Sequence, residues 1–125
     1  MAHYLFQGSY TSDSWATQVK EPGNVIDRIQ PVLTSCKATL QCIYYAFGET
    51  DVVSIIDFPT PEDAAAFSLA VTAGGSLKSA TLTPLLTVDQ GMKALKRAQK
   101  AGAQYRAPVA LNLTDEAAMP ATVDR

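Results

Sequence analysis

Two residues of this chain could move a proton. His3 is the only histidine, and histidine is the side chain that changes charge near neutral pH. Asp51 follows a short polar stretch, where a carboxylate at the mouth of a pocket could bind or deprotonate a ligand. Each has a common structural alternative: a histidine on a terminal strand is usually a surface residue, and an aspartate after a turn usually bonds the turn backbone. His3 and Asp51 are the candidate catalytic residues on this basis.

A second group of residues has the chemistry of a ligand pocket. Tyr4, Trp15 and Tyr44 belong to a concentration of aromatic side chains in the N-terminal part of the chain. Core packing accounts for most such residues. These three could also line an apolar cleft with polar tips, which suits a small apolar or aromatic ligand.

Three polar residues could add specificity to such a pocket. Gln7 and Ser54 lie on strands expected to be buried, so each needs a hydrogen-bond partner from the protein or from a ligand. Arg106 is near the C-terminus and could fold over the pocket to bind a carboxylate. The structural alternatives are a satisfied internal hydrogen bond for Gln7 and Ser54, and a surface position for Arg106.

No metal or cofactor site is indicated by the sequence. A single histidine argues against a histidine-based metal site within one chain. Cys36 and Cys42 lack the spacing of metal ligands, so we expect reduced, buried thiols, with a disulfide as the alternative. The chain has no glycine-rich phosphate loop and no nucleophile elbow. We therefore expect no metal and no cofactor.

The composition is that of one ordinary globular domain. The chain has 125 residues, 47% of them hydrophobic and 18% charged, with a net charge of −2. This balance supports a single core and gives no bulk field that would attract nucleic acid or an anionic membrane. The chain begins in a strand pattern rather than a signal peptide, and its apolar runs fall short of the roughly 20 residues of a membrane span. We expect a cytoplasmic protein that binds neither nucleic acid nor membrane.

Apolar periodicity and capping residues predict alternating strands and helices. The expected strands are 3–10, 38–47, 51–58 and 76–86. The expected helices are one that ends at Lys20, one from Asn24 to about Cys36, one over 61–73, and a last one from Thr87 to about Ala101. A tight turn over 48–50 joins the second and third strands, with a positive φ expected at Gly48.

The strand over 51–58 is apolar on both faces, which decides the expected fold. One face needs helices and the other needs a different cover. The element order is β-α-β-β-α-β with an extra C-terminal helix, which is typical of the ferredoxin-like split βαβ arrangement. Its first and third strands lie side by side in the centre. We therefore predict an α+β, ferredoxin-like fold that forms a homodimer through its sheet faces, a dimeric α+β barrel, with higher oligomers possible through edge strands.

Several segments resemble those of a known family. They are Tyr4–Thr11, Phe47–Asp51, Asp57–Pro59 with the alanine-rich helix after it, Leu82–Thr87, and Tyr105–Pro108. Over roughly residues 3–108 the chain resembles the GYD domain family, small bacterial α+β proteins named for a Gly-Tyr-Asp motif. Thr50 stands where the motif has tyrosine, between the retained Gly48 and Asp51. The resemblance implies a ferredoxin-like fold related to dimeric α+β barrels, and it implies no particular activity.

Three functions are compatible with these residues. The first is a homodimeric small-molecule-binding or accessory protein, built from one domain over 1–108 and an extended or disordered tail over 109–125. The second is a cofactor-independent α+β barrel enzyme, an oxygenase or isomerase on a small aromatic or carbonyl substrate. The third is a structural assembly module. A closed apolar cleft with His3 or Asp51 inside favours the enzyme, a cleft without such groups favours binding, and no cleft favours assembly.

Overall fold

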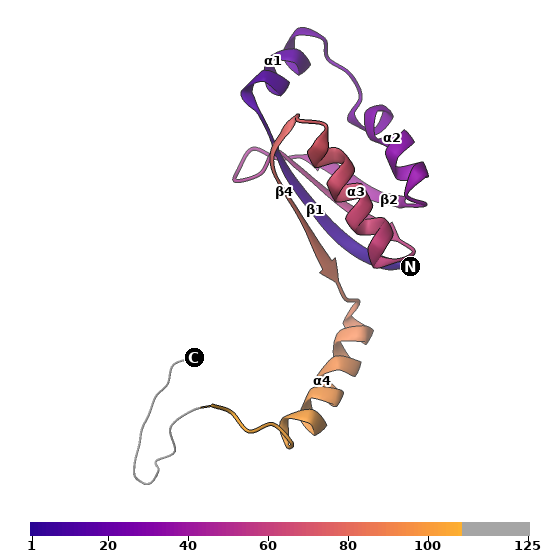
Figure 1. The fold of residues 1–125 in the computed structure, drawn as a ribbon, viewed down its shortest axis with the longest axis vertical. Helices are drawn as coiled ribbons and strands as arrows, with labels where there is room; N and C mark the ends of the chain where they lie inside the picture. Colours follow the sequence, from indigo (N-terminus) through magenta and orange to yellow (C-terminus); the bar gives the residue numbers. More distant parts are fainter. Residues whose placement is uncertain (109–125) are drawn as a thin grey trace. The chain divides into compact units, whose positions relative to one another are not determined.

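The computed structural model describes residues 1–108 of the chain. These residues divide between two compact units, of which the first is Met1–Leu86 and the second begins at Thr87. The first unit holds a sheet and three helices, and the described part of the second holds a single helix (Figure 1). The expected tail over 109–125 lies outside the described residues, and a single domain over 1–108 stays a prediction.

Every helix and strand expected from the sequence is present, with ends that differ by no more than one or two residues. The strands are β1 (Ala2–Tyr10), β2 (Thr39–Tyr45), β3 (Val52–Phe58) and β4 (Leu77–Leu85). The helices are α1 (Ser12–Lys20), α2 (Val25–Ser35), α3 (Pro61–Ala73) and, in the second unit, α4 (Val88–Gly102). Residues 1–108 therefore form an α+β protein. None of these helices has the length and apolar character needed to cross a membrane.

The helix ends follow local capping chemistry. Thr60 accepts a hydrogen bond from the backbone N–H of Asp63 at 3.1 Å, and Pro61 occupies the first turn of α3. The same helix ends at Gly74, and Gly75 follows with a φ of 81°, which only glycine adopts freely. Thr87 and Gln90 form the expected capping box at the start of α4.

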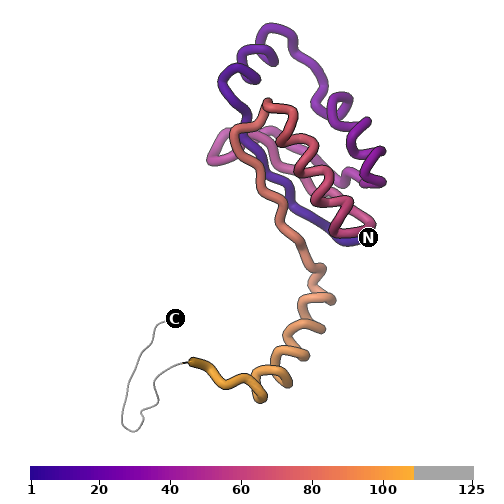
Figure 2. The backbone as a smooth tube through the Cα atoms, viewed as in Figure 1, coloured from indigo at the N-terminus to yellow at the C-terminus, as the bar shows by residue number. Residues whose placement is uncertain are grey.

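The sheet has the strand order β2-β3-β1-β4, and all neighbouring strands are antiparallel. Figure 2 shows β1, in indigo, running beside β4, which is far from it in the sequence. The expected central pair, β1 and β3, is confirmed. Pro84 lies on the edge strand β4, as expected, and an edge strand is where a sheet tolerates proline. This order is compatible with a ferredoxin-like fold.

Helices α2 and α3 cover one face of the sheet, and the core lies between these helices and the sheet. Its aromatic residues pack edge to face: the rings of Phe6 and Phe67 are 5.4 Å apart, and those of Tyr4 and Phe58 are 5.5 Å apart. The opposite face of the sheet carries half-buried apolar residues. They include Leu5, Val53 and Ile55 on the two central strands. The expectation that β3 is apolar on both faces is confirmed.

The connection between β2 and β3 differs from the expected tight turn. It spans residues 46–51 rather than 48–50, and its ends are held by a hydrogen bond from the Ala46 N–H to the Asp51 carbonyl at 2.8 Å. The expected positive φ at Gly48 is wrong, because Lys37 and Gly75 are the described residues that have one. A six-residue loop reverses direction without the left-handed residues that a two-residue hairpin requires.

The two cysteines are free, as expected. Cys36 is buried at the end of α2, and Cys42 is half-buried in β2.

Candidate functional site

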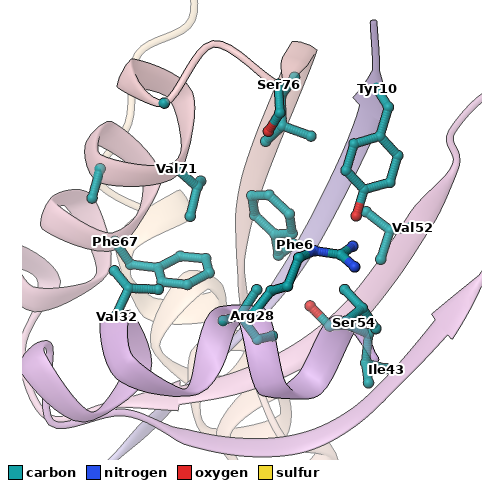
Figure 3. A pocket seen from close by; sticks show the side chains of 15 residues that line it. Phe6, Tyr10, Arg28, Val32, Ile43, Val52, Ser54, Phe67, Val71 and Ser76 are labelled. Carbon is teal, nitrogen blue, oxygen red and sulfur yellow. The ribbon is translucent and has the colours of Figure 1, made fainter. Parts of the chain in front are cut away.

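A cavity of about 260 Å³ lies between the sheet and helices α2 and α3 (Figure 3). It is formed within the first unit. Most of its lining is apolar: Phe6, Val25, Ile29, Val32, Ile43, Val52, Phe67, Ala70, Val71 and Leu77. Its polar lining comes mainly from Tyr10, Arg28, Ser54 and Ser76. An apolar cavity with a few polar groups is the usual form of a small-molecule site.

Arg28 and Tyr10 form the polar end of this cavity. Arg28 extends from α2, and its guanidinium points toward the hydroxyl of Tyr10 at the end of β1 (Figure 3). The same guanidinium donates a hydrogen bond to Gln18 of α1 at 3.1 Å and lies beside the hydroxyl of Tyr45. Arg28 is exposed, so this polar end is the mouth of the cavity.

The two groups at the mouth change each other's ionisation. Burial raises the pKa of Tyr10, and the neighbouring Arg28 only partly offsets that effect. Partial burial would by itself lower the pKa of Arg28, but the hydroxyls of Tyr45 and Tyr10 stabilise the cation, so its pKa is raised. A neutral phenol and a permanent cation therefore stand together at neutral pH.

Ser54 supplies a polar group inside the cavity. Only 2% of its surface is exposed, and its hydroxyl points into the cavity toward Arg28 (Figure 3). Among residues 1–108, no group forms a hydrogen bond with this hydroxyl. A buried hydroxyl without a partner costs about 1–3 kcal/mol, so this position is costly for the fold alone.

Asp51 forms hydrogen bonds that hold Tyr10 and Trp15 near the cavity mouth. One carboxylate oxygen accepts hydrogen bonds from the backbone N–H of Tyr10 at 2.9 Å and from the indole N–H of Trp15 at 3.2 Å. The backbone N–H of Asp51 donates to the Gly8 carbonyl at 2.8 Å. The expected bond to its own turn backbone is therefore wrong: the carboxylate bonds β1 and α1 instead. Asp51 does not line the cavity.

His3 lies on the opposite face of the sheet from the cavity. Its Nδ1 is bonded to Asp57, whose other oxygen accepts a hydrogen bond from the Gln41 amide. Successive side chains of a strand alternate between faces, so His3 and Asp57 project away from the face of Phe6 and Ser54. His3 is half-exposed and Asp57 is buried.

The aromatic residues expected to share one cleft lie in different places. Tyr4 is buried against Phe58 in the core, and Trp15 packs against Tyr10 with ring centres 5.0 Å apart. Tyr44 is 66% exposed on the face opposite the cavity, because its neighbour Ile43 lines the cavity. The expectation that Tyr4, Trp15 and Tyr44 line one cleft is therefore wrong. A ligand contact at each of them stays a prediction.

The remaining two candidates are Gln7, which does not line the cavity, and Arg106, which belongs to the second unit. Gln7 is half-buried on the open face of the sheet. Arg106 follows α4 and is exposed. Their proposed contacts with a ligand stay predictions.

The model of the GYD domain family matches residues 4–95. The chain belongs to the GYD domain family. The match begins within β1, includes the other three strands and ends within α4, so the resemblance of Tyr105–Pro108 lies beyond it. No curated protein sequence matches the chain.

In this GYD domain protein Asp51 has a positioning role. It holds the backbone of Tyr10 and the indole of Trp15, which packs on the Tyr10 ring near the cavity mouth. Thr50, the residue before Asp51, is half-buried in the loop before β3.

Sequence reasoning missed Arg28 and Tyr10 as site residues, although a signal for Arg28 exists. Arg28 lies three residues after Val25 and four before Val32, so it shares their face of α2. An arginine among the apolar residues of a helix face lies on the side of the helix that packs against the core. In this GYD domain protein it marks the point where the cavity opens.

Proposed function

We propose that this GYD domain protein binds a small, largely apolar molecule in the cavity between the sheet and helices α2 and α3. The observation that carries the proposal is the cavity itself, with apolar walls and polar groups from Arg28, Tyr10, Ser54 and Ser76. Its volume of about 260 Å³ exceeds the ~150 Å³ of an apolar cavity that holds benzene. It falls just below the range of about 300–1,000 Å³ for drug-sized ligands. A molecule somewhat larger than one aromatic ring fits this space.

The ionisable groups support binding rather than catalysis. No aspartate, glutamate, histidine or cysteine is among the described residues that line the cavity. His3 is on the opposite face of the sheet, and the Asp51 carboxylate is bonded to Tyr10 and Trp15. A general base must reach the proton that it removes. The oxygenase or isomerase alternative therefore has no proton acceptor of these types in the cavity.

The proposed assembly is a ferredoxin-like homodimer that buries the open face of the sheet. Leu5, Val53 and Ile55 are neighbours there, on the paired central strands β1 and β3. A contiguous apolar surface at the centre of a sheet favours burial against a partner. A second copy presents the same surface, as a two-fold interface requires.

Calorimetric titration with small aromatic acids and alcohols tests ligand binding. Val71→Phe places a ring in the cavity, and Val88→Phe makes the same change on α4, where Val88 is 83% exposed. We expect binding to the wild type and to Val88→Phe, with a loss of at least about tenfold in affinity for Val71→Phe because the added ring occupies the ligand's space. Equal binding by all three proteins would place the ligand elsewhere.

A further inference from the structure

The proposed function leaves the chemical class of the ligand open. We infer that the ligand is a carboxylic acid with an apolar body, whose carboxylate binds Arg28 and Tyr10 at the mouth while Ser54 donates to one of its oxygens. The inference rests on the proposed function of the same cavity. It follows from an arginine without an acidic partner and a buried hydroxyl without a hydrogen-bond partner, both within residues 1–108, and from the balance of charge around them.

Arg28 has a charge that the described protein does not neutralise. Among residues 1–108, no carboxylate lies within salt-bridge distance of its guanidinium. Its contacts are the neutral amide of Gln18 and the hydroxyls of Tyr10 and Tyr45. A guanidinium is planar and presents paired N–H donors that match the two oxygens of a carboxylate. Arg28 is thus ready to receive an anion from the cavity side.

Ser54 provides the second, independent observation. Its hydroxyl is buried, points into the cavity toward Arg28, and has no hydrogen-bond partner among the described residues (Figure 3). A buried polar group of this kind calls for a partner. An anion held by Arg28 would supply an acceptor oxygen to the same hydroxyl.

The charge balance favours a singly charged group. Arg28 is the one cation among the described lining residues. Asp51, which bonds the backbone of Tyr10, adds negative charge behind the mouth. A carboxylate is neutralised by one guanidinium, whereas a phosphate dianion would leave an unpaired charge in a partly buried site.

The rest of the cavity fits an apolar body. Beyond the mouth, the walls are formed by side chains such as Phe6, Val32, Phe67 and Val71. Among the described lining residues beyond the mouth, Ser54 and Ser76, which is near the start of β4, are the ones whose side chains can form hydrogen bonds. An aromatic or branched aliphatic body buries its surface there, and its acid group stays at the mouth.

Matched pairs of acids and alcohols test the inference on the full chain. 3-Phenylpropanoate and 3-phenylpropan-1-ol share one body and differ in charge, and shorter and longer homologues extend both series. Calorimetric affinities are measured for the wild type, Arg28→Gln and Ser54→Ala. Arg97→Gln removes the same charge from the exposed surface of α4 and is the matched control. Circular dichroism confirms that each variant is folded.

We expect the acid to bind at least about tenfold more tightly than its alcohol, the usual value of a hydrogen bond to a charged group. Arg28→Gln should remove this preference, Ser54→Ala should weaken acid binding roughly fivefold, and Arg97→Gln should change neither. If the alcohols bind as tightly as the acids, or if Arg28→Gln behaves like Arg97→Gln, the inference is overturned and the apolar site stands. If no member of either series binds, the proposed function falls with it.

Discussion

The carboxylate of Asp51 accepts a hydrogen bond from the backbone N–H of Tyr10, 41 residues earlier in the chain, at 2.9 Å. This bond joins the loop before β3 to the last residue of β1. The same oxygen also holds the indole of Trp15, which packs on the ring of Tyr10. Asp51 therefore holds both the backbone of Tyr10 and the indole that packs on its ring, beside the mouth of the cavity.

Removal of this carboxylate should destabilise the fold. Asp51→Ala leaves the Tyr10 N–H and the Trp15 indole N–H without their acceptor. We expect a loss of about 2 kcal/mol in the free energy of unfolding, measured by urea denaturation. Glu49→Ala is the control, because Glu49 is exposed in the same loop and should cost less than about 0.5 kcal/mol. Equal losses in the two variants would contradict the positioning role of Asp51.

Replacement of Ser54 should affect the free energy of unfolding in the opposite direction. Its hydroxyl is buried without a partner among the described residues, so Ser54→Ala should leave stability unchanged or raise it by up to about 1 kcal/mol. Ser9→Ala is the matched control, because the Ser9 hydroxyl is equally buried and donates to the Glu49 carbonyl at 3.3 Å. We expect a loss of about 1 kcal/mol for Ser9→Ala in urea unfolding. A comparable loss for Ser54→Ala would show that its hydroxyl already has a partner.

The order and ends of the helices and strands could be predicted because they depend on local chemistry. Thr60 and Pro61 start α3 by capping, and Gly75 follows its end with a positive φ. The six-residue connection before β3 was not predicted, because the Asp51 side chain bonds Tyr10 and Trp15 across the fold rather than its own turn.

The site depends on tertiary packing and was mostly missed. The cavity exists because α2 lies over the sheet at a spacing that no local pattern specifies. Arg28 reaches Tyr10 only in that arrangement. The expected aromatic cleft ignored a consequence of strand alternation: Tyr44 must face away from the cavity because Ile43 lines it. Ser54 was correctly expected to be buried. That its hydroxyl has no partner within residues 1–108 depends on the tertiary neighbours, which the sequence does not specify.

Stability should fall at high pH because of Tyr10. Burial raises the pKa of this phenol above its ordinary value of 10.0. Between that value and the higher pKa of the folded state, the unfolded chain releases a proton that the folded protein keeps. The stabilising effect is therefore complete below about pH 10 and is lost as the pH rises through the folded-state pKa.

Urea unfolding between pH 8 and about pH 11 measures this loss. Tyr10→Phe should flatten the decline, whereas Tyr105→Phe, at a position 70% exposed, should leave it as in the wild type. An unchanged decline in Tyr10→Phe would show that the phenol is not protected in the fold.

The open face of the sheet should govern self-association. Ile55 lies at its centre on β3, so Ile55→Lys should convert the proposed dimer to a monomer at micromolar concentration, as measured by analytical ultracentrifugation. Leu69→Lys makes a similar change on α3, where the side chain is 71% exposed, and should leave the dimer intact. A wild-type protein that sediments as a monomer would refute the assembly.

Methyl NMR spectra with and without 3-phenylpropanoate test the central claim most directly. We predict that the ligand shifts the methyl signals of Val32, Ile43 and Val71, which line the cavity, and leaves those of Val53 and Ile55 on the open face unchanged. Shifts at Val53 and Ile55 without shifts at the cavity residues would contradict a binding site between the sheet and helices α2 and α3.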